Sequence, residues 1–139
     1  MKVVINKCFG GFGISHKAVM LYAKLKGFKV YPFSEARDTK GNLDYHNFVP
    51  WDGRGEQPFS LHYAKSPLEK GKYKDDAYFS PRDIERNDPE LIRVVEQLKS
   101  KANGNLAELS IVKIPDGVEW EIDDYDGRES VHEKHRVWS

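Results

Sequence analysis

The chain has 139 residues, of which 39% are hydrophobic and 32% are charged. This length is typical of one folded domain, and no apolar run approaches the roughly 20 residues that a membrane-spanning helix needs. Lys and Arg together equal Asp and Glu at 22 each, so no overall field attracts nucleic acid in general. We therefore expect a single cytoplasmic domain over residues 1–139, without membrane contact or generic nucleic-acid binding.

The first 31 residues predict a strand, a loop, a helix and a second strand. Residues 3–5 are an apolar strand that the sequence FGGFG at 9–13 interrupts. Ser15 is a suitable N-cap for a helix over 16–26, which Gly27 would end. Residues 28–31 form the second strand, stopped by Pro32. We expect a βαβ unit whose two strands pair in parallel.

Residues 34–87 carry many Gly, Pro, Asp, Lys and aromatic residues and show no clear periodicity. A structureless loop of this length is uncommon inside a compact domain. The segment therefore predicts short strands and turns, and we interpret it as a variable, aromatic-rich insertion.

The last third has stronger local signals. Residues 88–90 (DPE) combine an N-cap, a first-turn proline and an acidic residue, which predicts a helix that residues 103–104 (NG) would end. Residues 106–114 and 118–123 predict strands. Residues 126–127 (DG) predict a two-residue hairpin turn that places Ile122 opposite Val131 and Glu121 opposite His132. The predicted fold is α/β, with the βαβ unit, a C-terminal helix and an antiparallel hairpin on one mixed sheet.

The glycine loop, residues 9–15, is the first candidate site. Backbone amides and the positive end of the helix dipole would converge there, which favours an anion such as phosphate. The sequence is neither a Walker loop nor a GxGxxG fingerprint, so a tight turn that closes strand against helix is the alternative. The candidate phosphate-binding residues are Gly10, Gly11, Phe12, Gly13, Ser15, His16 and, near the C-terminus, Arg136.

Two tryptophans are candidates for stacking on a nucleotide base. Trp138 lies beside Arg136, which could pair with a phosphate, and Trp51 lies near Arg54. A terminal aromatic docked on the core explains Trp138 equally well, and Trp51 also suits a partner-protein surface.

Cys8 precedes the glycine loop, where a helix N-terminus can lower a thiol pKa. No orienting Asp or Asn is identifiable for a pair with His16, so we favour a structural role for this thiol. A single cysteine forms no internal disulfide and supplies no Cys-based zinc site.

Glu119, Glu121 and Asp123 alternate along one predicted strand, and His132 lies on the return strand. Carboxylates with histidine can hold a divalent metal. Ordinary alternation on a half-exposed strand explains the same pattern. We expect no metal and no cofactor.

Several motifs resemble a family of small, uncharacterised proteins of bacteriophages and prophages. They are residues 4–15 (VINKCFGGFGIS), 88–91 (DPEL), 103–104 (NG), 114–120 (IPDGVEW), 125–127 (YDG) and 135–138 (HRVW). The resemblance covers both ends of the chain and implies a bacterial host cell as the setting. In that setting, small proteins often oppose host defence, some by sequestering nucleotide signals.

These observations favour a binder of a small phosphorylated ligand, most plausibly a nucleotide or a nucleotide-derived immune signal, with a homodimer as a further expectation. Two alternatives remain open. One is a metal-dependent or general acid/base enzyme that acts on a nucleotide or phosphoester. The other is a protein that inhibits a host factor through its aromatic middle segment.

Overall fold

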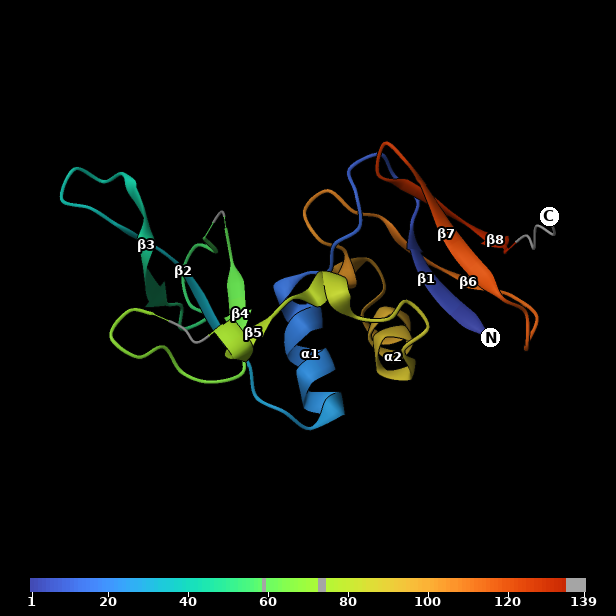
Figure 1. Cartoon of the computed structure of the whole chain (residues 1–139), viewed down its shortest axis with the longest axis horizontal. Helices are drawn as coiled ribbons and strands as arrows, with labels where there is room; N and C mark the ends of the chain where they lie inside the picture. The colour runs from blue at the N-terminus through green and yellow to red at the C-terminus, as the bar shows by residue number, and fades with distance from the viewer. Residues whose placement is uncertain (59, 73–74, 135–139) are drawn as a thin grey trace, which may run out of the picture. The chain divides into compact units, whose positions relative to one another are not determined.

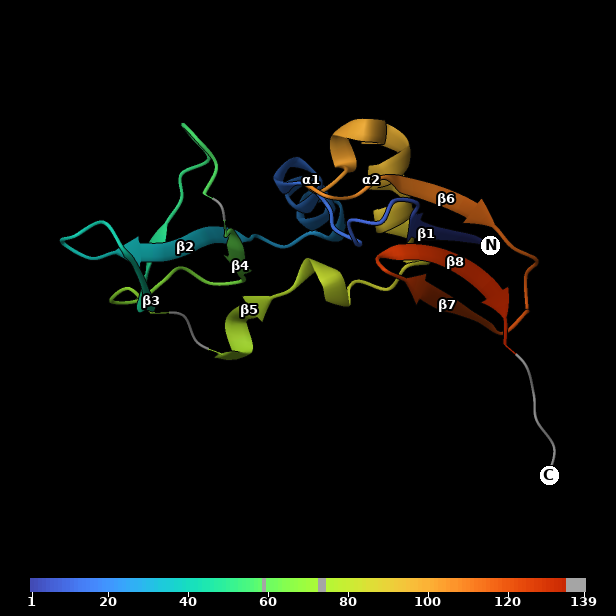
Figure 2. The ribbon, with the colours of Figure 1, turned by 90° about the horizontal axis from the view of Figure 1, so that it is seen from above.

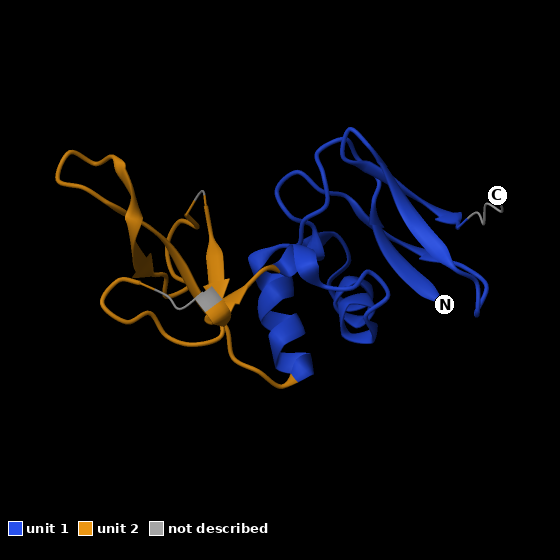
Figure 3. Cartoon of the chain, in the orientation of Figure 1, with its two compact units in different colours: residues 1–26, 81–139 blue, residues 27–80 orange. Residues whose placement is uncertain are grey.

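The computed structural model describes residues 1–58, 60–72 and 75–134 (Figure 1). The chain divides into two compact units: residues 1–26 with 81–139 form the first unit, and residues 27–80 form the second (Figure 3). Helices and strands occur together, which confirms the predicted α/β class. No helix within the described ranges is long and apolar enough to cross a membrane.

The first unit is assembled from both ends of the chain. Strand β1 (Lys2–Asn6) pairs antiparallel with β6 (Leu109–Lys113), and β7 (Trp120–Tyr125) pairs with β8 (Arg128–Glu133). Helices α1 (His16–Lys26) and α2 (Pro89–Leu98) pack against each other, and α2 also contacts β1 (Figure 2). Short 3-10 helices, η2 (Pro81–Asp83) and η3 (Lys99–Ala102), connect these elements.

The core of the first unit lies between β1 and the two helices. Hydrophobic burial is the main favourable term in folding, and β1 is the strand most completely removed from water. The fully or nearly fully buried core residues are Val3, Val4, Ile5, Ala18, Val19, Ala23, Leu91, Val94 and Ala102.

Both helices begin at the residues that the sequence predicts. The Ala18 amide donates to Ser15 Oγ at 3.1 Å, so Ser15 caps α1. Asp88 Oδ1 accepts from the amides of Glu90 at 2.8 Å and Leu91 at 3.3 Å, and Pro89 occupies the first turn of α2.

The predicted hairpin is confirmed in detail. Ile122 lies opposite Val131, and Glu121 lies opposite His132. Asp126 and Gly127 both have positive φ, at 51° and 90°, as a two-residue type I′ turn requires.

The predicted parallel pairing of the first two strands is wrong. The partner of β1 is β6, and every ladder among the described residues is antiparallel, in three separate sheets instead of one mixed sheet. The apolar run of β1 predicts a buried strand but carries no information on which strand lies beside it. Pro32 also does not end its strand, because β2 spans Tyr31–Arg37.

The second unit is a small antiparallel sheet with the strand order β3-β2-β4-β5. Its other strands are β3 (Leu43–Pro50), β4 (His62–Ala64) and β5 (Tyr78–Phe79), with a 3-10 helix, η1 (Asp75–Ala77), before β5. Phe33, Tyr63 and Ala64 are its most buried residues. The segment that we interpret as an aromatic-rich insertion therefore supplies most of a sheet.

Candidate functional site

The glycine loop packs directly against two other backbone segments. A Cβ on Gly10 would lie 1.9 Å from the carbonyl oxygen of Leu106. A Cβ on Gly127, in the hairpin turn, would lie 2.5 Å from the amide nitrogen of Gly11. Residues 103–106 and the hairpin turn thus approach the loop more closely than any side chain would allow. Segments from both ends of the chain, at residues 9–13, 103–106 and 126–127, thus meet at this point.

The polar groups at the start of α1 already have protein partners. The Ser15 amide donates to the Ala102 carbonyl at 2.9 Å, and the Ser15 hydroxyl donates to the Lys101 carbonyl at 2.6 Å. Burial lowers the pKa of the His16 imidazole, which favours its neutral form. The Ser15 amide and hydroxyl are therefore already engaged, and His16 carries no positive charge at neutral pH.

A buried polar network holds the glycine loop against β1 and the hairpin turn. The Glu129 carboxylate accepts two hydrogen bonds from the Arg86 guanidinium, at 2.6 and 2.8 Å, and one from the Asn6 amide at 2.8 Å. The Asn6 side chain, completely buried, donates to the carbonyls of Cys8 and Gly127 at 2.7 Å each. These contacts join β1, the glycine loop and the hairpin turn.

Phe12 completes this arrangement, because the Arg86 guanidinium carbon lies 3.4 Å from the centre of its ring. The close backbone contacts and the network give the glycine loop a packing role, which corresponds to the tight-turn alternative. Neither of the two pockets described below includes a residue of this loop. Phosphate binding at Gly10, Gly11 and Gly13 stays a prediction.

Two of the predicted ligand contacts, Arg136 and Trp138, lie outside the described residues. Trp51 belongs to the second unit, where its indole Nε1 donates to the Arg54 carbonyl at 3.0 Å. It is not among the residues that line the pocket described below.

The Cys8 thiol lies 3.0 Å from the Leu106 carbonyl and 3.4 Å from Asn6 Oδ1. Both neighbours are hydrogen-bond acceptors, and neither is a base of the kind that activates a nucleophilic cysteine. These contacts fit the structural role expected for Cys8.

The acidic hairpin contains an arrangement that superficially resembles a catalytic triad. His132 Nε2 lies 2.8 Å from Ser130 Oγ and 3.3 Å from Asp123 Oδ2. A triad needs the serine and the carboxylate on different ring nitrogens, whereas here both contact the same one. The Asp123 and His132 side chains are also more than half exposed. Within the described part of the chain, no three His, Cys, Asp or Glu side chains are placed to hold a metal ion.

The second unit contains a pocket of about 360 Å³ beside strands β2 and β3. Ligand pockets are typically apolar with a few placed polar groups, and this volume is at the small end of their range. The lining residues are Ser34, Glu35, Arg37, Leu43, Val49, Pro58 and Ser60. The β2–β3 ladder has a bulge between Glu35 and Ala36, a feature that commonly re-aims side chains next to binding sites.

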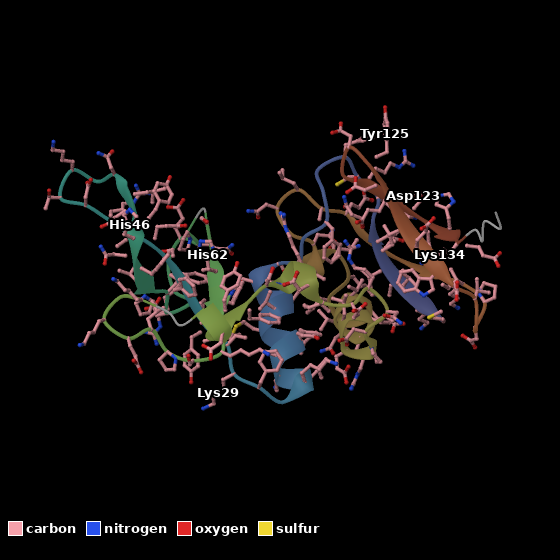
Figure 4. All side chains as sticks on the ribbon, in the orientation of Figure 1. Lys29, His46, His62, Asp123, Tyr125 and Lys134 are labelled. Atoms are coloured by element: carbon pink, nitrogen blue, oxygen red, sulfur yellow. The ribbon has the colours of Figure 1, made fainter. Side chains whose placement is uncertain are left out.

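One wall of this pocket is backed by an ion pair. His62 Nε2 lies 2.8 Å from Glu35 Oε1 and 3.1 Å from Ser60 Oγ. Cross-strand pairing explains the proximity: Phe33 lies opposite His62, and Glu35 lies two residues further along β2 on the same face. Figure 4 shows His62 on β4.

Burial alone would raise the pKa of the Glu35 carboxyl, whose side chain is only 10% exposed. Hydrogen bonds from His62 and Ser60 outweigh that effect and lower the pKa below its ordinary value. Glu35 is therefore ionised at neutral pH and accepts the hydrogen bond from His62 Nε2.

The ring of His62 is held by aromatic neighbours. Its centre lies 5.4 Å from that of Phe33 and 6.3 Å from that of Phe48. Because Nε2 carries a proton and contacts both Glu35 and Ser60, it is not available as the base for the Ser60 hydroxyl. The cluster thus forms a fixed polar wall and lacks the geometry of a nucleophilic relay.

The sequence does not reveal this site. Ser60 and His62 have the two-residue spacing of one strand face, but their partner Glu35 lies on a strand 27 residues away from His62. Only the register of β2 against β4 brings them together.

Comparisons of the chain with protein-family models, with curated proteins and with solved structures found no match.

Proposed function

We propose that the protein binds a small phosphorylated ligand, such as a nucleotide or nucleotide-derived signal, in the pocket of the second unit. The observation that carries this proposal is the combination of one cation and two hydroxyls with an apolar wall, beside the carboxylate of Glu35. Arg37 supplies the cation, Ser34 and Ser60 supply the hydroxyls, and the apolar side chains are Leu43, Val49 and Pro58.

The Arg37 guanidinium is oriented by the β2–β3 turn. Its Nη1 donates to the Gly41 carbonyl at 2.7 Å, and a guanidinium has five N–H groups in total. Arginine binds phosphate through two parallel hydrogen bonds, which a lysine at the same place would not provide. We expect the phosphate at this end of the pocket.

The rest of the ligand would lie along the apolar wall. Leu43 and Val49 are 38% and 45% exposed, although both are large apolar side chains in strands. A base or other flat apolar group placed on them would reduce that exposure. The ionised Glu35 would accept a hydrogen bond from an N–H or hydroxyl of the ligand.

In the bacteriophage setting that the sequence motifs imply, a protein of this kind would act by sequestering its ligand. Catalysis is not part of the proposal, because neither histidine cluster has the geometry of a relay.

The test is a thermal-shift measurement with orthophosphate, nucleoside monophosphates and cyclic nucleotides. A ligand present at about 100 times its Kd stabilises the folded state by about 2.7 kcal/mol. For a chain of this size, that corresponds to an increase of roughly 8–12 °C in Tm.

The matched variants are Arg37→Ala, in the pocket, and Arg93→Ala, on the exposed surface of α2. Both remove one positive charge. We expect Arg37→Ala to abolish the shift with phosphorylated ligands and Arg93→Ala to leave it unchanged. Equal responses of the two variants, or no response of the wild-type protein to any phosphorylated compound, would contradict the proposal.

A further inference from the structure

The first unit has a separate open groove of about 440 Å³ between residues 82–86 and one face of the β7–β8 hairpin. Its apolar lining is formed by Ile84, Trp120 and Ile122. Trp120 and Ile122 are the half-buried residues of β7, and they alternate with the exposed Glu121 and Asp123 of the opposite face.

The charge around this groove is predominantly negative. Four carboxylates line it against two guanidinium groups, which leaves a formal charge of −2. One of the four, Glu129, is neutralised by its bidentate pair with Arg86. The remaining carboxylates, Asp83, Glu85 and Asp124, are all exposed to solvent, with Arg82 as the only other cation among the lining residues.

We propose that this groove is a docking site for a basic peptide segment of a partner protein. A lysine or arginine of that segment would lie on the Trp120 ring, with its charge directed toward Asp83 and Glu85. An aromatic face beside carboxylates binds a cation through the ring quadrupole and through charge pairing together. The aliphatic stem of the same side chain would cover Ile84 and Ile122, as long basic side chains commonly do.

Charge complementarity distinguishes this occupant from others. A phosphorylated ligand would meet the net negative charge, and a purely apolar segment would leave the rim carboxylates without a counter-charge. The groove therefore differs in specificity from the pocket of the second unit, and neither proposal depends on the other.

The experiment uses the full chain and a fluorescein-labelled eight-residue peptide of alternating lysine and leucine, followed by fluorescence anisotropy. The same peptide with glutamine in place of lysine is the neutral probe. Titrations at about 20 mM and about 300 mM salt measure the electrostatic part of the binding.

The test variant is the double substitution Asp83→Asn with Glu85→Gln. Its matched control, Glu108→Gln with Glu121→Gln, removes the same charge from exposed positions of the same unit that do not line the groove. We expect the test variant to weaken binding of the lysine peptide about threefold to thirtyfold, and the control to change it less than about twofold.

A Trp120→Leu variant leaves the charge of the groove unchanged and tests the contact between the peptide and the aromatic ring. We expect it to weaken binding of the lysine peptide at both salt concentrations. Equal weakening by the two double variants would show attraction to overall charge and would overturn the proposal. So would equal affinity for the lysine and glutamine peptides, or no binding at low salt.

Discussion

Replacing Glu129 by alanine would leave the Arg86 guanidinium buried without its counter-charge. The two side chains are only 5% and 18% exposed and are joined by hydrogen bonds of 2.6 and 2.8 Å. The substitution also removes the acceptor of the Asn6 amide. Breaking a buried pair of this kind typically costs about 3–5 kcal/mol, because the remaining charge stays desolvated.

A loss of this size is a large part of the roughly 5–15 kcal/mol that stabilises a typical domain. For a chain of this length, it corresponds to a decrease of about 10–20 °C in Tm. Urea denaturation followed by far-UV circular dichroism measures the change directly. The control is Asp123→Ala, which breaks the exposed contact with His132 and should cost less than about 1 kcal/mol.

A double variant separates the charge from the remaining contacts. Arg86→Met with Glu129→Leu removes both charges, so no buried ion is left alone, and most of the lost stability should return. About 1 kcal/mol should stay lost, because the Asn6 amide still lacks its acceptor. If Glu129→Ala alone costs less than about 1 kcal/mol, the network does not hold the loops together as described.

Two other substitutions test contacts within the first unit: one tests the close packing of the glycine loop, and the other tests the ionised state of Asp88. Gly10→Ala should destabilise the fold by about 1–3 kcal/mol, because its Cβ would overlap the Leu106 carbonyl. Gly13→Ala should cost less than about 1 kcal/mol, because its Cβ would have its nearest neighbour at 4.0 Å. Equal losses of stability in urea denaturation would contradict the close contact at Gly10. Burial opposes ionisation of Asp88, but hydrogen bonds from Lys26, Tyr22 and the Glu90 amide lower its pKa below the ordinary value. The stability that ionised Asp88 contributes is therefore complete above about pH 4 and is lost as the pH falls through the lowered pKa. Asp88→Asn should therefore flatten the acid side of the stability–pH curve, measured by thermal denaturation between about pH 2 and 6, and an unchanged curve would exclude this contribution.

Local signals predict local structure in this chain. The helix start at residues 88–90 and the turn at 126–127 depend on side chains within a few residues of each other, and both occur where the sequence places them. The N-cap at Ser15 belongs to the same group. Each of these features is set by the conformational preference of one or two residues, so no knowledge of the rest of the fold is needed.

Pairing between distant segments has no such signal. The apolar side chains of β1 fit any buried strand, and its antiparallel partner β6 lies more than 100 residues later. The contacts of Asn6 with Gly127 and Glu129 span more than 120 residues. Glycines in the loop at 9–13 are equally compatible with a bound anion and with a closely packed backbone, and only the neighbouring chain distinguishes these possibilities.

The candidate pocket was missed for a related reason. Its residues belong to the part of the chain without periodicity, where short strands are joined by turns rich in Gly and Pro. Glu35 and His62 are ordinary polar residues until the register of β2 and β4 places them on one face.

Strand β1 pairs with a strand that lies more than 100 residues later, and this delays its pairing during synthesis on the ribosome. The first strand leaves the ribosome before β6, β7 and β8 exist, and at about 5–20 residues per second the wait is roughly 5–20 s. During that time, three consecutive buried aliphatic residues, Val3, Val4 and Ile5, have no sheet to join. The intervening 54 residues of the second unit have all their partner strands by residue 80. Nascent chains of this protein thus expose an unpaired apolar strand while the second unit already has all its strands, so residues 3–5 are open to aggregation until β6 is made.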